Sequence, residues 1–304
     1  MNYRKILGWI AFICAVYYIG SSLNSAYIFQ RRCVQILTLC ITSYLVNLST
    51  TLFQRLTHNR IVSPALLGFE RLYLLIQIGC LMILNNPMLN PLIALFTMSI
   101  IGLMIYPKIL KRCGNDIYLM LLIGTVFSTL MGALSTTLQM MMDPLEFSIL
   151  RSQNFVSLNA IQPQFLSISV VLTLLIIGIY NHKRHQFDVL VLGDDTAQSL
   201  GVDVPLVQKE ILFIVILASS LVTSLVGPLT FLGLLTSNLA QELCPNAKTK
   251  PIIITGTLLA FILLLGSQLI FERLFNFTGT ITVLINLIGS LTLIIFMIKE
   301  RKHD

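Results

Sequence analysis

The sequence predicts an all-α polytopic membrane protein with about ten transmembrane helices, forming a single domain over residues 1–304. Hydrophobic residues make up 56% of the chain and charged residues only 11%, and the mean hydropathy is +0.85. These values lie outside the range of ordinary soluble domains. Apolar stretches of about 20 residues, enough for a helix to cross a hydrocarbon core of about 30 Å, also follow one another along the chain.

Eight apolar stretches have about the length of one membrane span. They are Ile6–Leu23, Val34–Phe53, Ser63–Leu84, Met88–Tyr106, Ile117–Met142, Phe165–Tyr180, Ile252–Phe271 and Ile281–Ile298. The first stretch follows two basic residues and precedes several serines, so a cleaved signal peptide is the alternative to a retained first span. A retained span suits a chain that stays in the membrane along its length.

The basic residues predict the orientation, because short cytoplasmic loops carry an excess of lysine and arginine. With both termini inside, fifteen of the twenty basic residues lie on the cytoplasmic side. Arg31, Arg32, Arg151 and Arg273 then lie outside, and Arg71 lies within a span. The net charge of +7 therefore indicates topology and contact with anionic lipid rather than binding of nucleic acid.

The ninth apolar stretch, Ile211–Leu243, is predicted to cross the membrane and return. Lys209 before it and Lys248 after it have to share the cytoplasmic side, and Gly227-Pro228 provides the break between two legs. Thirty-three residues give only about 50 Å of helix, so one leg has to be short. The backbone near Gly227 is then expected at membrane depth, either beside a translocation path or in a tight outer turn.

The chain contains no recognisable catalytic, metal or nucleotide site. Its four histidines fall in predicted cytoplasmic loops or the tail, its cysteines lack paired spacing, and no GxxxxGK[ST] motif occurs. The only ionisable residues within predicted spans are Glu70-Arg71 and Glu272-Arg273, which lie near span ends and are expected to act as anchors or to pair with each other. We therefore predict no cofactor and no metal, and ATP hydrolysis would need another subunit.

One polar segment, FDVLVLGDDTAQSLGVD over residues 187–203, interrupts the apolar chain. It falls within a predicted cytoplasmic loop of about residues 183–207 and reads as two short amphipathic turns, punctuated by Gly193 and Gly201. A membrane protein rarely keeps such a segment without a docking role. The alternative is an uninvolved amphipathic loop resting on lipid, which four aspartates in the segment disfavour.

Three motifs resemble the permease subunits of bacterial iron-siderophore (FecCD/vitamin B12-type) ABC importers. They are LGDDTAQSLGVD followed by GPLTFLGLL, FQRLTHNRIVSPALLG over Phe53–Gly68, and LQMMMDPLEF over Leu138–Phe147. Many family members continue GPIxFxGLxxPHxxR, and this chain has Ser237, Asn238 and Gln241 in place of proline, histidine and arginine. This difference favours the branch that pairs two different permeases for ferric catecholate or related siderophores over the vitamin B12 branch.

The resemblance implies that the polar segment docks onto paired cytoplasmic ATPases through two short coupling helices between spans six and seven. The coupling residues expected from the motif are Leu192, Gly193, Asp194, Asp195, Ala197, Leu200 and Gly201. The glycines allow sharp helix ends, and the aspartates favour the start of a helix. Leu190, Leu192, Ala197 and Leu200 are expected to form the apolar contact face.

The resemblance implies two further sites. Arginines on the outer face would grip glutamates of a substrate-binding protein, although Gln35 stands where a second arginine is usual, and an outer arginine can also be a snorkelling anchor. The docking candidates are Arg32, Arg273, Arg31 and Arg151. The translocation path is expected to include Ser135, Thr136, Gln139, Gly227, Pro228 and Asn286, although hydroxyl side chains also serve ordinary helix packing.

The predicted function is therefore a non-enzymatic permease subunit in the bacterial cytoplasmic membrane that moves ferric siderophore by alternating access. Its expected partners are an ABC ATPase dimer, a second and paralogous permease, an extracytoplasmic siderophore-binding protein and membrane lipid, with no nucleic acid. The alternatives are a permease for vitamin B12 or haem, an ion-coupled secondary transporter and a membrane-embedded lipid-modifying enzyme.

Overall fold

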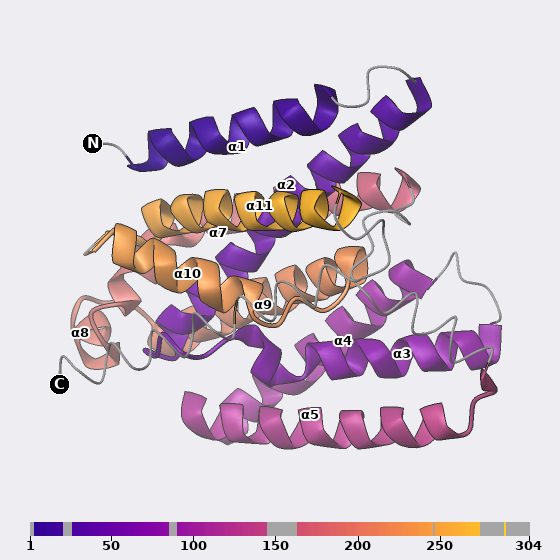
Figure 1. The fold of residues 1–304 in the computed structure, drawn as a ribbon. Helices are drawn as coiled ribbons and strands as arrows, with labels where there is room; N and C mark the ends of the chain where they lie inside the picture. Colours follow the sequence, from indigo (N-terminus) through magenta and orange to yellow (C-terminus); the bar gives the residue numbers. More distant parts are fainter. Residues whose placement is uncertain are drawn as a thin grey trace.

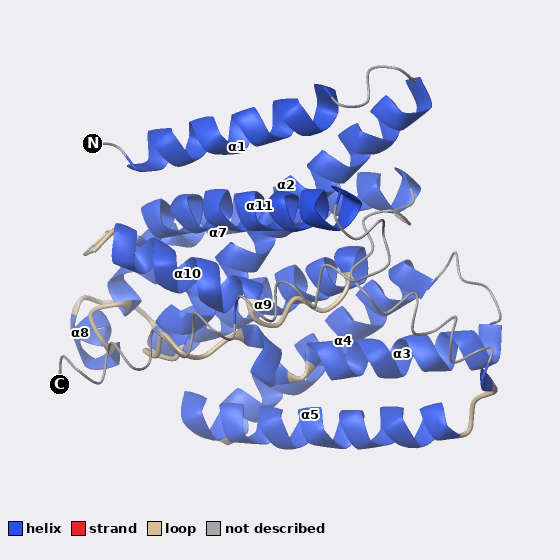
Figure 2. Ribbon diagram, in the orientation of Figure 1, coloured by secondary structure: helices blue, strands red, loops and turns tan. Residues whose placement is uncertain are grey.

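The computed structural model describes residues 3–20, 26–84, 90–144, 163–245 and 247–273 and Gly289, and all regular structure within them is helical (Figures 1 and 2). The elements are α1 (Tyr3–Gly20), α2 (Ala26–Leu56), the 3₁₀ helix η1 (Pro64–Leu67), α3 (Phe69–Leu84), α4 (Asn90–Arg112), α5 (Ile117–Met140), α7 (Pro163–Leu190), α8 (Asp194–Ser199), α9 (Val204–Val226), α10 (Leu232–Leu243) and α11 (Thr249–Arg273).

Six of the described helices are long and apolar enough to cross a membrane, namely α2, α4, α5, α7, α9 and α11. The predicted all-α polytopic class is therefore confirmed. The last predicted span, Ile281–Ile298, falls outside the described residues apart from Gly289.

Helix α2 runs through the centre of the bundle and packs against α7, α9, α10 and α11 (Figure 1). Its buried side chains include many polar ones, and several of them bond back to the helix's own carbonyl groups. Asn47 is an example, because its amide donates to the Ser43 carbonyl at 3.0 Å while its Oδ1 accepts from Thr236 of α10 at 2.9 Å. A Cβ atom on Gly256 of α11 would collide with the same amide, so α11 lies close against α2.

Helices α2 and α7 extend furthest beyond their predicted apolar spans. Helix α2 begins at Ala26 rather than Val34 and so includes two arginines, and α7 continues from Tyr180 to Leu190 through a basic run. Lys183 on this extension forms an ion pair with Glu210 of α9 at 2.8 Å. Hydropathy finds only the lipid-embedded part of a helix, so it misses polar turns that continue past the membrane surface.

The predicted span Ser63–Leu84 divides into η1 and α3 at Gly68. Gly68 has φ of 77°, a conformation that side chains other than glycine rarely adopt, and a Cβ there would stand 2.9 Å from the Ser128 backbone of α5. The remaining α3 has 16 residues and is about 24 Å long. The break is therefore required by the close approach of α5.

The predicted break at Gly227-Pro228 is found in the structure. Helix α9 ends at Val226, and Gly227 caps it with φ of 97°. Helix α10 has only 12 residues, or about 18 Å, and is therefore the short leg that the length of the segment requires. Helix α9 is buried along most of its length, so the non-helical residues between the two legs lie within the protein rather than on its rim.

Candidate coupling and translocation sites

The segment from α7 to α9 contains one short helix, α8, where the sequence predicted two (Figure 1). Gly193 with φ of 98° precedes α8, and Gly201 with φ of 83° follows it, so both turns need glycine. Helix α8 is the second predicted helix, and the first is instead the end of α7, which continues to Leu190. Helix α9 begins soon after α8 because Asp203 caps it by accepting a hydrogen bond from the Leu206 backbone at 3.2 Å.

Three leucines beside α8 are exposed. Leu192 is 59% exposed, Leu200 is 61% and Leu206 is 47%, and we call these three side chains the α8 surface. Leu190 and Ala197 are fully buried, so the prediction that they belong to the contact face is wrong. They pack inward and hold α8 against the bundle, which leaves the α8 surface free to meet another protein.

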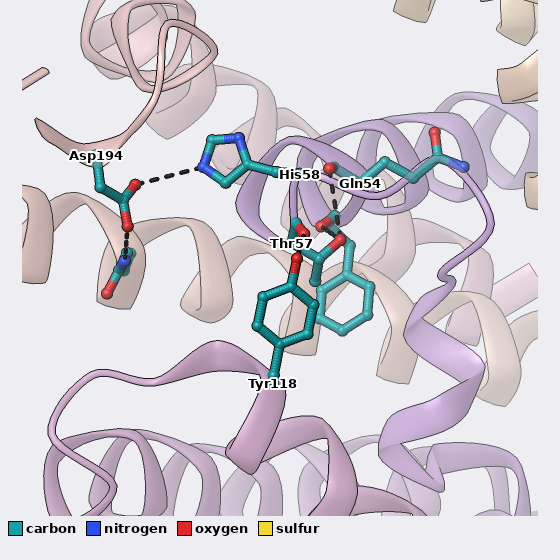
Figure 3. Close-up of polar contacts among 7 residues, drawn as sticks. Gln54, Thr57, His58, Tyr118 and Asp194 are labelled. Atoms are coloured by element: carbon teal, nitrogen blue, oxygen red, sulfur yellow. Dashed lines mark hydrogen bonds and ion pairs between the residues drawn. The ribbon is translucent and has the colours of Figure 1, made fainter. Parts of the chain in front are cut away.

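Asp194 links α8 to two neighbouring helices (Figure 3). Its Oδ1 lies 3.3 Å from Nε2 of His58, directly after α2, and its Oδ2 accepts from Nε2 of Gln208 on α9 at 3.3 Å. Asp195 is exposed and stands at the same end of α8. The two aspartates therefore differ, because one ties α8 to the bundle and the other faces solvent.

A buried polar network joins α2 to α10, and Gln54 lies at its centre. The Gln54 Oε1 accepts from the Ser237 hydroxyl and from the Gln241 amide, each at 2.7 Å. Its Nε2 donates to the Arg60 carbonyl at 2.6 Å and to Asn238 Oδ1 at 3.3 Å. Ser237, Asn238 and Gln241 are the three residues that depart from the proline, histidine and arginine of the family motif. The sequence analysis interpreted these residues only as a departure from the motif. The four-residue spacing of Ser237 and Gln241 places both on one face of α10, and this face meets Gln54.

The end of α2 also contacts the start of α5. The Tyr118 hydroxyl lies 3.4 Å from the Thr57 carbonyl, which places α5 beside the same end of α2 that meets Asp194 (Figure 3). Helices α8, α2 and α5 therefore meet at one end of the bundle, which we call the α8 end.

A small pocket of about 50 Å³ lies next to the α9–α10 break. Glu70 lines it, and the Thr230 hydroxyl donates to Glu70 Oε2 at 2.7 Å. Hydroxyl groups make up much of the remaining wall, from Ser49, Thr50, Ser63, Ser219 and Thr223. Glu70 therefore binds a hydroxyl from the broken segment rather than acting as a surface anchor. This contact was not predictable, since Glu70 and Thr230 are 160 residues apart in the chain.

The three path candidates on α5 are not among the residues that line this pocket. The Ser135 hydroxyl donates to the Met131 carbonyl at 2.8 Å, and the Thr136 hydroxyl donates to the Gly132 carbonyl at 2.9 Å. Gln139 follows one turn later on the same helix and is partly exposed. Hydroxyl bonding of this kind is common in membrane helices. Asn286 lies outside the described residues.

Arg32 is held inside a cluster at the opposite end of the bundle. Its guanidinium forms an ion pair with Glu272 of α11 at 2.6 Å, lies 4.4 Å from the centre of the Tyr18 ring and donates to the Tyr18 carbonyl. Gln35 belongs to the cluster, because its Oε1 accepts from the Tyr18 hydroxyl at 2.6 Å. Glu272, expected to be an anchor or to pair with Arg273, thus pairs across the bundle.

The other predicted docking arginines differ in their surroundings. Arg31 is exposed and lines a pocket of about 150 Å³ together with the Arg32 cluster. Arg273 ends α11, but its side chain lies outside the described part of the structure, as does all of Arg151. The Arg32 side chain is only 12% exposed, and its contacts link α1, α2 and α11 within the bundle rather than facing outward.

Comparison with known proteins settles the class of this chain. The model of the FecCD transport family matches residues 5–299. The chain belongs to the FecCD transport family. The petrobactin import permease YclO of Bacillus subtilis (strain 168) is 35% identical over 99% of both chains, and a second petrobactin permease of that strain, YclN, is 26% identical over 73% of this chain and 70% of its own.

Solved structures agree on the fold. A metal-chelate type ABC transporter in an inward-facing conformation superposes with a TM-score of 0.83 at 19% identity, covering 97% of this chain and 98% of the other. The resemblance predicted from the three motifs is therefore confirmed, as is the predicted class, a permease subunit of a siderophore-importing ABC transporter. Neither vitamin B12 transport nor ion-coupled transport is favoured.

Proposed function

We propose that this chain is one half of a heteromeric permease that imports a ferric siderophore of the petrobactin type. The observation that carries the proposal is the 35% identity to a petrobactin permease over the whole length of both chains. The same bacterium has a second permease named for the same import system, and this chain is less similar to it. The likeness supports a partner that is a different permease rather than a second copy.

The proposed topology has ten spans, with both termini and the α8 end in the cytoplasm. In support, Arg4, Arg184, Lys248 and Lys250 gather around one pocket at that end, as cytoplasmic loops require. The ten spans are the six long apolar helices, together with α1, α3, the short leg α10 and the predicted span Ile281–Ile298. Re-entry at Gly227-Pro228 would bring irregular backbone to the Glu70 pocket at membrane depth.

The proposed mechanism couples ATP hydrolysis to the spans through α8. An ABC ATPase dimer would cover the α8 surface, and its closure would displace α8 together with the two groups that Asp194 contacts. Because His58 directly follows α2 and Gln208 lies on α9, a displacement of α8 acts on both helices. ATP is hydrolysed in the partner, and this chain supplies only the path.

On the outer face, we propose that Arg31, Arg273 and Arg151 meet an extracytoplasmic siderophore-binding protein. Arg32 supports this surface from within, because its charge is already paired with Glu272. Gly227, Pro228, Ser135, Thr136, Gln139 and Asn286 remain proposed path residues. For the first two, the adjacent Glu70 pocket gives structural support.

Affinity purification of this chain from its native membrane in mild detergent tests the proposal. We expect a second, non-identical FecCD-type permease and an ABC ATPase to co-purify. Recovery with the ATPase but with copies of this chain alone would overturn the heteromeric assembly. Deletion of the gene should abolish uptake of ⁵⁵Fe-labelled ferric petrobactin while uptake of a ferric hydroxamate continues, and unchanged petrobactin uptake would overturn the substrate assignment.

A further inference from the structure

A second pocket, of about 510 Å³, opens at the α8 end of the bundle. It lies between the start of α1, the end of α7 and the connection from α10 to α11, and helices α1 and α7 both pack on α11 (Figure 1). Its volume falls within the range of about 300–1,000 Å³ that is typical of small-molecule sites. None of the proposed coupling, docking or path residues lines it, so it is separate from the sites described above.

The pocket is strongly basic. Arg4 of α1, Arg184 of α7, and Lys248 and Lys250 at the start of α11 line it, with His185 beside them. None of these four cations forms an ion pair with another residue in the described part of the chain. Lys183 is different, because its ammonium is paired with Glu210. The four unpaired charges come from three separate elements and converge on one cavity.

The lining contains one carboxylate, Asp188, against these four cations. Its Oδ1 accepts from the backbone N–H of Thr249 at 2.9 Å and so caps the first turn of α11. Four positive charges and one negative charge leave a net charge of about +3 around the pocket, with His185 counted as neutral. This excess of positive charge in one cavity favours the binding of an anion.

The position of the pocket indicates which anion. Helices α7 and α11 are both long and apolar enough to span the membrane, and the pocket lies beside the end of each helix that carries basic residues. Cys244, Ala247 and Pro251 provide apolar wall beside the charges, which suits a group that is part anionic and part hydrocarbon. Basic pockets between spans on the cytoplasmic side are known to take anionic headgroups.

We propose that this pocket binds the phosphate of an anionic phospholipid of the cytoplasmic leaflet. The phosphate bridges α1 to α7 and α11, and the glycerol end of the headgroup lies against the apolar wall. The proposal rests on the proposed function only for the orientation of the α8 end, because it needs neither the siderophore nor the ATPase.

Native mass spectrometry of the purified full chain, titrated with phosphatidylglycerol in mild detergent, tests the proposal. The variant is Lys248→Gln with Lys250→Gln. The matched control is Lys108→Gln with Lys111→Gln, which removes the same charge from exposed lysines near the end of α4. Because each basic residue near an anionic surface contributes about fivefold in affinity, the first pair should weaken lipid binding about 10- to 30-fold and the control less than twofold.

Three other results would overturn the proposal. Equal losses in the two double variants would show that bound lipid reports overall charge, and unchanged binding in both would show that the pocket is unused. Either outcome overturns the proposal. Competition separates the two sources of phosphate, since millimolar inorganic phosphate should leave the lipid adduct in place. Displacement of the lipid by inorganic phosphate would overturn the lipid assignment in favour of a free anion.

Discussion

Replacing Gln54 by leucine should destabilise this protein far more than a typical polar-to-apolar change in a membrane helix. Gln54→Leu keeps a similar volume but removes four hydrogen bonds, to Ser237, Gln241, Asn238 and the Arg60 carbonyl. Ser237 and Gln241 can still bond each other, at 3.3 Å in the present structure, so the other two acceptors are stranded. The buried Asn238 acceptor costs about 1–3 kcal/mol when stranded, and the part-buried Arg60 carbonyl costs less, so the loss in the free energy of unfolding is about 1–4 kcal/mol.

An independent estimate gives a similar magnitude. Hydrogen bonds between membrane helices average about 0.6 kcal/mol each, so four of them contribute about 2.4 kcal/mol. Unfolding by SDS in mixed micelles, followed by far-ultraviolet circular dichroism, measures the change. In a double-mutant cycle, Gln241→Leu should cost much less in the Gln54→Leu background than in the wild type, because one partner of the bond has already gone.

Gln77→Leu is the matched control. Gln77 on α3 is 3% exposed, close to the 4% of Gln54, yet its Oε1 has no hydrogen-bond partner within the described structure. Removing its unsatisfied Oε1 together with one hydrogen bond to Tyr73 should change the free energy of unfolding by less than about 1 kcal/mol. If Gln54→Leu and Gln77→Leu lower stability equally, the network contributes nothing specific and the reasoning is refuted.

Three further substitutions distinguish a side chain that contacts the ATPase from side chains that stabilise the fold. Leu200→Asp places a charge on the exposed α8 surface, so the amount of ATPase that co-purifies should fall about tenfold or more, while the unfolding midpoint stays the same. An altered midpoint would contradict the exposure of this side chain. Ala197→Phe overfills a fully buried position, so it should lower the free energy of unfolding by about 1–3 kcal/mol and also reduce ATPase binding. A variant of normal stability would show that α8 is not packed as described. Glu272→Gln leaves the mostly buried Arg32 without its counter-charge, so the free energy of unfolding should fall by about 2–4 kcal/mol. An unchanged free energy of unfolding would mean that the ion pair is absent in the membrane.

Features that depend on chain length and local chemistry were predictable. The break at Gly227-Pro228 followed from two lysines that had to share one side and from a segment too short for two full crossings, and α10 is the short leg. Gly193 and Gly201 were expected at helix ends, and both have positive φ. Each inference used residues near one another in sequence, where geometry and charge rules act directly.

Features that depend on pairing across the bundle were not predictable. Arg32 and Glu272 are 240 residues apart and lie at the ends of different predicted spans, yet the fold brings their side chains within 2.6 Å. Gly68 looked like an interior residue of a span, and only the approach of Ser128 explains why the helix stops there. The burial of Ala197 was also not predictable, since the six-residue helix α8 is too short for hydrophobic periodicity to show which of its faces is buried.

The contacts of α2 indicate how a displacement at α8 could be transmitted. At the α8 end, His58 meets Asp194 and Gln54 is bonded to α10. Further along, Gly233 of α10 and Gly256 of α11 lie so close to Thr50 and Asn47 that a single Cβ would collide with each. Such contacts hold the three helices close together, and closely packed surfaces do not deform continuously. We infer that α2, α10 and α11 move as one body, so a force on α8 has to rotate this unit against its neighbours.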